Sequence, residues 1–121
     1  MSMQMEFIKV LPSPQALMED YPISKESKLL KLQRDEIIKN IFTGKDDRFL
    51  LVIGPCSSDN EDAVLDYVHR LAKLQEKVAE KIFIVPRLYT NKPRTIGVGY
   101  KGMLHQPSPE GEEDMLGGII A

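Results

Sequence analysis

The sequence is poor in the features that mark secreted, membrane-spanning and nucleic-acid-binding proteins. Its 121 residues include one cysteine, so no disulfide forms within the chain and a reducing cytoplasm is the expected location. No apolar run approaches the roughly 20 residues that span a bilayer, and residues 1–10 lack the long apolar core of a signal peptide. The net charge of −2 argues against a general nucleic-acid or membrane-surface binder.

The strongest pattern is two apolar runs separated by an amphipathic segment. Residues 49–53 and 82–85 are apolar without alternation, which is typical of strands covered on both faces of a parallel sheet. Between them, apolar residues recur at helical spacing up to about Glu80, and Ser58 or Asp59 is the expected N-cap. The expected buried stripe consists of Val64, Tyr67, Val68, Leu71, Leu74 and Val78. We therefore predict a β-α-β unit of an α/β protein, with a right-handed crossover.

Two helices are predicted before the first strand. Pro14 can open a short helix within an arm, residues 1–22, that packs on the rest of the chain or on a second subunit. A partly ordered tail is the alternative. Ser24 is the expected N-cap of a longer helix over residues 25–41, and Gly44 follows its end.

The carboxyl-terminal part contains few signals of regular structure. Residues 90–109 are rich in glycine and proline and are predicted to form loops. Acidic residues from Glu110 onward could begin a helix that the last residues only start. Two strands cannot form a closed core. The sequence therefore reads as the front of a longer α/β protein, either a fragment or a chain that completes its sheet with another chain.

Residues with reactive or charged side chains follow the carboxyl ends of the two predicted strands, where ligands bind in parallel α/β proteins. They are Cys56 after the first strand, and Arg87, Lys92, Arg94 and Lys101 after the second. Arginine offers a planar fork of donors for carboxylate or phosphate, and lysine offers a compact charge. The pattern indicates a site for a small ligand with several anionic groups. A solvated basic loop is the alternative.

Cys56 is a candidate metal ligand. Its thiolate would suit zinc, iron, cobalt or a similar divalent ion, although a lone cysteine is more often an inert, small apolar residue. His69 falls within a predicted helix and His105 within a loop, and no HxxxH, CxxC or paired-acid pattern accompanies them. A complete metal site cannot be assembled from the residues of this sequence.

Four segments in a fixed order carry a family resemblance. GPCS at 54–57, Arg87, KPRT at 92–95 and VGYKG at 98–102 resemble the amino-terminal portion of type I 3-deoxy-D-arabino-heptulosonate 7-phosphate (DAHP) synthases. A sister enzyme that makes 3-deoxy-octulosonate 8-phosphate shares the fold, but KPRT with GxKG favours the heptulosonate enzyme. The resemblance implies a (β/α)8 TIM barrel that is incomplete in this chain. Residues 1–47 would be an N-terminal extension of arm plus helix, and residues 48–121 the first two β/α units.

The resemblance also implies a reaction. The family condenses phosphoenolpyruvate with erythrose 4-phosphate to DAHP and phosphate, in the shikimate pathway, with a divalent metal ion (Mn, Fe, Co or Zn) that polarises the aldehyde. Cys56 would be one metal ligand, and a histidine and two acids beyond Ala121 would be the others. The implied substrate-binding residues are Arg87 and Lys92 for phosphoenolpyruvate, and Lys92, Pro93, Arg94 and Thr95 for the sugar phosphate. Lys92 is the implied catalytic residue. The chain alone is expected to be inactive.

Three further expectations accompany this resemblance. It implies a homo-oligomer, a dimer or a tetramer, and an aromatic amino acid effector of the full-length enzyme. Pro86 departs from the family pattern, because a residue with a backbone N–H is more usual before Arg87, and the loss of that N–H could disturb the register there.

The alternative function is a non-catalytic anion- or partner-binding chain that assembles through its open sheet edges or its N-terminal arm.

Overall fold

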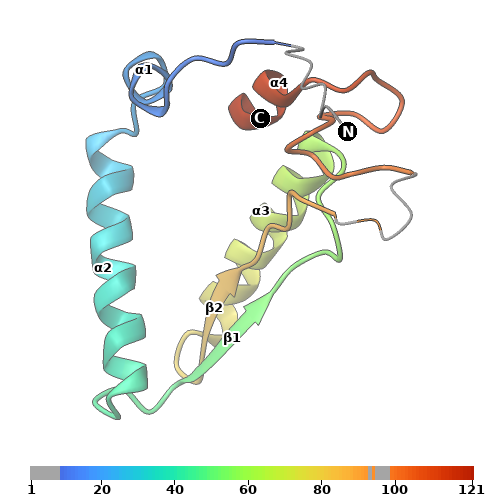
Figure 1. The fold of residues 1–121 in the computed structure, drawn as a ribbon. Coiled ribbons are helices and arrows are strands. Elements are labelled where there is room, and N and C mark those ends of the chain that lie inside the picture. Colours follow the sequence, from blue (N-terminus) through green and yellow to red (C-terminus); the bar gives the residue numbers. More distant parts are fainter. Residues whose placement is uncertain (1–8, 93, 95–98) are drawn as a thin grey trace, which may run out of the picture. The chain divides into compact units, whose positions relative to one another are not determined.

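A computed structural model describes residues 9–92, 94 and 99–121 (Figure 1). The chain divides into two compact units, Met1–Glu36 and Ile37–Ala121, and each is described by itself. The elements are α1 Pro14–Asp20, α2 Lys25–Phe42, β1 Phe49–Ile53, α3 Glu61–Val78, β2 Ile82–Pro86 and α4 Met115–Ile120. Among the described residues, no helix combines the length and the apolar character that crossing a membrane requires. The predicted division between residues 47 and 48 stays a prediction.

The helices α1 and α2 begin where the sequence predicts. The Oγ of Ser13 accepts a hydrogen bond from the N–H of Ala16, and Pro14 stands at the first helical position. The Oγ of Ser24 accepts from the N–H of Ser27 at 3.1 Å, which confirms the predicted N-cap of α2. No residue of either helix is buried. The packing predicted for the arm stays a prediction, and its residues 1–8 lie outside the described part of the chain.

The predicted β-α-β unit is confirmed. β1 and β2 pair in parallel, with Phe49 opposite Ile82 and Ile53 opposite Pro86. The N–H of Arg87 donates to the carbonyl of Ile53 at 2.8 Å, so the register holds up to Arg87. Groups on a strand alternate between its two neighbours, and Pro86, one residue before Arg87, therefore directs its nitrogen away from β1. Its missing N–H removes nothing from the β1–β2 ladder.

An ion pair fixes the entry into β1. Arg48 donates from Nη2 to Oδ2 of Asp46 at 2.7 Å and from Nε to Oδ1 at 3.0 Å, and its backbone N–H also donates to Oδ1. Its guanidinium lies 5.4 Å from the ring centroid of Phe83 and donates to the carbonyl of Ala79. These bonds lower the pKa of Asp46 and raise that of Arg48. The polar turn therefore joins the start of β1 to the end of α3.

The start and the end of α3 differ from the sequence prediction, and so does one position of its predicted stripe. Its N-cap is Asn60, whose Oδ1 accepts from the N–H of Ala63 at 2.9 Å. Ser58 is not the cap, because the helix begins only at Glu61 and the Oγ of Ser58 has no hydrogen-bond partner among the described residues. The helix ends at Val78 rather than Glu80. On the predicted stripe, Leu74 is 45% exposed, and Gln75 occupies the half-buried place instead.

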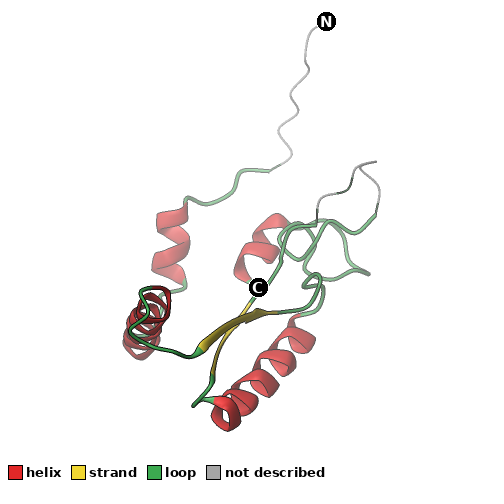
Figure 2. Cartoon of the chain, turned by 90° about the horizontal axis from the view of Figure 1, so that it is seen from below, coloured by secondary structure: helices red, strands yellow, loops and turns green. Residues whose placement is uncertain are grey.

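Burial within the sheet is uneven. Phe83 and Ile84 of β2 are 4% and 2% exposed, and α3 contacts β2. Phe49 and Val52 of β1 are 65% and 56% exposed. The prediction that both strands are covered on both faces is therefore wrong for β1 in this chain. The described residues form two strands with α3 along the sheet (Figure 2), and β1 has too few neighbours to be covered.

The helix predicted to begin among the acidic residues from Glu110 onward is present as α4, but it begins only at Met115. Oδ1 of Asp114 accepts from the N–H of Gly117 at 3.1 Å and caps it. Gly118 is buried because it lies against the carbonyls of Met103 and Leu104, where a Cβ would approach them to 2.4 and 2.1 Å. The segment before α4 lies beyond the carboxyl ends of β1 and β2 (Figure 1).

Candidate functional site

The exits of β1 and β2 lie against each other. A Cβ on Gly54 would stand 1.7 Å from the carbonyl oxygen of Arg87, so the position accommodates only glycine. One step further, the N–H of Ser58 donates to the carbonyl of Tyr89 at 2.8 Å. The two segments after the strands are therefore held side by side by their backbones, as expected for residues at the carboxyl edge of a parallel sheet.

Arg87 is anchored beside the loop that contains Cys56. Its Nη1 donates to the carbonyl of Pro55 at 3.2 Å, and its guanidinium lies 5.0 Å from the ring centroid of Tyr89. A guanidinium has five N–H donors, and the bond to Pro55 engages one of them. The thiol of Cys56 is free and exposed. The structure thus brings together the two predicted site residues that follow the strands.

The basic loop is fixed by pairing between residues 90–92 and 101–104. The N–H of Lys92 donates to the carbonyl of Lys101 at 2.7 Å, and the N–H of Leu104 donates to that of Thr90 at 2.8 Å. Gly102 has a φ of +101°, and a Cβ there would approach the carbonyl oxygen of Thr90 to 2.5 Å. The backbone at Lys92 is therefore held in place. The predicted site residues Pro93 and Thr95 lie outside the described residues.

Tyr100 connects this loop to the rest of the site. Its single hydroxyl proton is shared between two carbonyl acceptors, that of Gln106 at 3.0 Å and that of Ser58 at 3.3 Å. Burial raises the pKa of Tyr100, and the nearby charge of Asp59 raises it further. The Nε of Arg94 donates to the backbone carbonyl of Tyr100 at 2.9 Å. Sequence reasoning missed Tyr100, and its aromatic ring within VGYKG was the available signal.

Most of the candidate cations have no acidic partner in the part of the chain that the structure describes. Within the described ranges, no ion pair joins Arg87, Lys92 or Arg94 to a carboxylate. Lys101 differs, because its Nζ lies 2.9 Å from Oε1 of Glu113, and this hydrogen bond lowers the pKa of Glu113. Three cations without acidic partners among the described residues can attract anions, whereas Lys101 is already paired with Glu113.

Cys56 has no cluster of further metal ligands around it in the described part of the chain. Among the described residues, no group of three or more His, Cys, Asp and Glu side chains could hold a metal ion. His69 lies on α3. His105 lies in the loop before α4, where its backbone N–H donates to the carbonyl of Gly102. Cys56 is therefore a single candidate ligand, and the described residues do not supply the further ligands that a metal ion needs.

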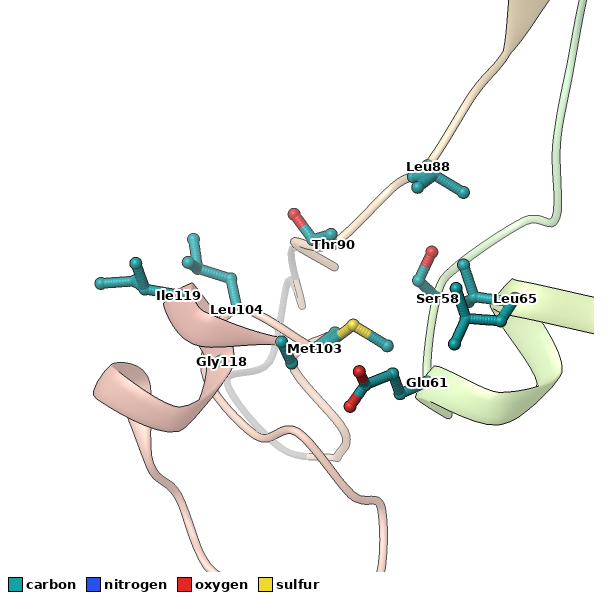
Figure 3. A pocket seen from close by; sticks show the side chains of 11 residues that line it. Ser58, Glu61, Leu65, Leu88, Thr90, Met103, Leu104, Gly118 and Ile119 are labelled. Carbon is teal, nitrogen blue, oxygen red and sulfur yellow. The ribbon is translucent and has the colours of Figure 1, made fainter. Parts of the chain in front are cut away.

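An apolar cavity of about 380 Å³ lies next to the site (Figure 3). It is lined mainly by Leu65 on α3, Leu88, Met103 and Ile119 on α4, with Ser58 at its wall. Ser58 is 1% exposed, and its Oγ has no hydrogen-bond partner among the described residues. Leu88 lines the cavity, whereas its neighbour in the chain, Arg87, does not. The cavity is therefore separate from the anion-binding candidates.

Comparison with known proteins decides the family. The model of the DAHP synthetase I family matches residues 20–114. The chain belongs to this family. The phospho-2-dehydro-3-deoxyheptonate aldolase of Haemophilus influenzae is 46% identical over 99 residues, which cover 82% of this chain and 27% of that protein. The phenylalanine-inhibited aldolase of Saccharomyces cerevisiae is 40% identical over 97 residues, which cover 80% of this chain and 26% of that protein.

A solved structure agrees with this membership of the DAHP synthetase I family. The phospho-2-dehydro-3-deoxyheptonate aldolase of Francisella tularensis superposes with a TM-score of 0.86 at 32% identity, covering 96% of this chain and 34% of that chain. This chain thus spans about a quarter to a third of the length of these relatives. The resemblance drawn from GPCS, KPRT and VGYKG is confirmed at the level of the family.

Proposed function

We propose that the chain is the amino-terminal part of a DAHP synthase, which condenses phosphoenolpyruvate with erythrose 4-phosphate and releases phosphate. Membership of the DAHP synthetase I family supports this, as do the names of the relatives. The observation that carries the proposal is the group Arg87, Lys92 and Arg94, which has no acidic partner among the described residues at the carboxyl edge of a parallel sheet. The proposed fold of the whole protein is a (β/α)8 barrel.

Each cation has a proposed role. Arg87 and Lys92 would bind phosphoenolpyruvate, while Lys92 and Arg94, with Pro93 and Thr95, would bind the phosphate of the sugar. Two anionic substrates repel each other, and fixed cations between them offset that repulsion and hold the reacting carbons in contact. Lys92 would serve both anions, and we assign it to catalysis for this reason. The hydrogen bond from Arg94 to Tyr100 supports a fixed position for its guanidinium.

The metal proposal concerns Cys56 alone. We propose its exposed thiol as one ligand of a divalent ion (Mn, Fe, Co or Zn), since a thiolate suits several of these metals. The remaining ligands would come from outside the described residues, and no catalytic step is derived through the ion. The isolated chain is accordingly expected to release no phosphate from the two substrates.

The regulation and the assembly of the full-length protein are also proposals. One relative is named phenylalanine-inhibited, and others are named Tyr-sensitive or Phe-sensitive. We propose that an aromatic amino acid also inhibits the full-length protein, and that this protein is a cytoplasmic homo-oligomer acting in aromatic amino acid biosynthesis. The alternative, a non-catalytic partner-binding chain, is supported for the isolated chain by the exposed apolar residues of β1.

A chimeric enzyme tests the catalytic proposal. The segment of the Haemophilus influenzae aldolase that matches this chain is replaced by the corresponding residues of this chain, and DAHP formation is measured. We expect an active enzyme, and we expect Lys92→Ala to lower the rate by about 100-fold or more, the loss typical of a group that stabilises charge in the transition state. The control is Lys73→Ala, an exposed lysine on α3, which should leave the rate unchanged.

Two kinds of outcome would contradict these proposals. A folded chimera without activity, or one in which Lys92→Ala and Lys73→Ala have equal effects, would overturn the assignment of the site. Phosphate release by the pure 121-residue chain would contradict the proposal that the chain alone is inactive.

A further inference from the structure

The side chains of Arg87 and Tyr89 lie together on one face of the segment that follows β2. The backbone of this segment is held against the exit of β1, because the N–H of Arg87 donates to the carbonyl of Ile53. The carbonyl of Tyr89 likewise accepts from the N–H of Ser58 at 2.8 Å. Side chains alternate between the two faces of an extended segment. Leu88, between the two residues, lines the apolar cavity (Figure 3), and Arg87 and Tyr89 share the other face.

The ring of Tyr89 supports the guanidinium of Arg87 from one side. The guanidinium carbon lies over the ring, 5.0 Å from its centroid, within the roughly 6 Å at which an aromatic face attracts a cation. Tyr89 is half-buried, whereas Arg87 is exposed, so the fold partly encloses the ring while the guanidinium faces solvent. The Nη1 of Arg87 also donates to the carbonyl of Pro55 at 3.2 Å. A ring and a backbone carbonyl thus hold this guanidinium in place.

A second arginine of the chain shows how this arrangement differs from a structural ion pair. The guanidinium of Arg48 lies 5.4 Å from the ring centroid of Phe83, but it also donates from Nε and Nη2 to the carboxylate of Asp46. That carboxylate offsets the charge of Arg48. Within the described ranges, no ion pair joins Arg87 to a carboxylate. An aromatic face orients a guanidinium without neutralising it, so Arg87 keeps the charge that an anion needs.

We propose that Tyr89 is the positioning residue of Arg87, and that it holds the guanidinium in the orientation that binds an anionic group of phosphoenolpyruvate. This inference rests on the proposed function, in which Arg87 binds that substrate. A long side chain loses conformational freedom when it binds a ligand, and holding it in advance reduces this loss. Tyr89 therefore contributes to the affinity for phosphoenolpyruvate through Arg87, and it does not contribute to the binding of erythrose 4-phosphate.

NMR of the 121-residue chain tests the contact itself. Protons over the face of an aromatic ring are shifted upfield, so the Nε–H and δ protons of Arg87 should resonate upfield of those of Arg70, an exposed arginine on α3. Tyr89→Leu removes the ring and should abolish the shift, whereas Tyr89→Phe keeps the ring face and should preserve it. Tyr21→Leu, at an exposed tyrosine, is the control. A parent chain without the upfield shift, or a shift that persists in Tyr89→Leu, would overturn the proposal.

Kinetics of the chimeric aldolase described above test the role of the contact. Tyr89→Leu should raise KM for phosphoenolpyruvate about fivefold, the loss of one cation–π contact. It should leave kcat and KM for erythrose 4-phosphate unchanged, because the lost interaction contributes to binding alone. Tyr89→Phe should restore the parental KM. Arg87→Ala should raise KM for phosphoenolpyruvate further, and adding Tyr89→Leu to it should have no additional effect, since Tyr89 then has no guanidinium to position.

The failure of this inference can be told apart from the failure of the proposed function. Equal increases in both KM values, or an additive effect of Tyr89→Leu on Arg87→Ala, would show that Tyr89 only stabilises the fold and would overturn the inference. A parental chimera without activity, or an unchanged KM for phosphoenolpyruvate in Arg87→Ala, would overturn the proposed function or its assignment of Arg87. The NMR comparison would still decide whether Tyr89 holds the guanidinium.

Discussion

The hydroxyl of Tyr100 lies 3.3 Å from the carbonyl oxygen of Ser58, a residue 42 positions earlier in the chain. Ser58 stands two residues after Cys56, and Tyr100 in turn accepts the hydrogen bond of Arg94 through its own carbonyl. One side chain therefore connects the exit of β1 to the basic loop. The relative positions of the proposed metal ligand and of a proposed phosphate-binding residue depend on this connection.

Removing the hydroxyl should destabilise the chain without altering the packing of the ring. In Tyr100→Phe the carbonyls of Ser58 and Gln106 lose a part-buried donor, and we expect a loss of about 1–2 kcal/mol in the free energy of unfolding. Urea denaturation measures it. Tyr21→Phe, at a residue that is 57% exposed, is the control and should be nearly neutral. Equal effects of the two substitutions would show that the hydrogen bonds of the Tyr100 hydroxyl do not stabilise the folded chain.

The close approach of the two strand exits gives a second prediction. Gly54→Ala would place a Cβ 1.7 Å from the carbonyl oxygen of Arg87, so the strands would have to separate. We expect a loss of at least about 3 kcal/mol in the free energy of unfolding, or failure to fold. Gly111→Ala is the matched control, because its Cβ would make ordinary contacts at 3.5 Å, and it should change stability little. A Gly54→Ala chain as stable as the control would contradict the described geometry.

Local sequence patterns predicted most elements, and long-range contacts account for what they missed. The N-cap at Ser24 and the apolar run of β1 are encoded by neighbouring residues, so they could be found without the fold. The segment after β1 is bonded to the segment after β2 at Ser58 and Tyr89, a contact that depends on the pairing of the strands, and α3 begins only after it, with Asn60 as its cap. Gln75 rather than Leu74 is half-buried because the edge of β2 offers it two partners.

The candidate site could be predicted in composition but not in arrangement. Cys56, Arg87 and Lys92 were found because strand ends and motifs are visible in sequence. That Lys101 is paired with Glu113, and so differs from its neighbours, depends on how the loop before α4 folds back. The roles assigned to these residues stay predictions until binding and activity are measured.

The ion pair of Asp46 gives a prediction with a definite direction in pH. Hydrogen bonds from Arg48 lower the pKa of Asp46 below its usual 3.8 in the folded chain. The folded state therefore binds the proton less tightly than the unfolded state. The resulting stability is fully present above the unfolded pKa and is lost as the pH falls through the folded pKa.

Asp46→Asn should thus be less stable than the parent chain at neutral pH, and the difference should shrink as the pH is lowered below about 4. Urea denaturation at a series of pH values measures it. Asp47→Asn, at the exposed neighbouring carboxylate, is the control and should give a smaller difference. A difference between Asp46→Asn and the parent that grows on acidification would have the wrong sign for this ion pair.

The last prediction concerns the anion site of the isolated chain. Inorganic phosphate, added in an NMR titration, should perturb the backbone amides near Lys92 and Tyr100, because Arg94 is held beside Tyr100 without an acidic partner among the described residues. Arg94→Ala should weaken this binding about tenfold or more, the loss of one hydrogen bond to a charged group. Arg70→Ala is the matched control, because Arg70 is already paired with Asp66 on α3 at 2.8 Å. If both substitutions weaken phosphate binding equally, the binding reflects the general charge of the chain, and the basic loop is only a solvated surface.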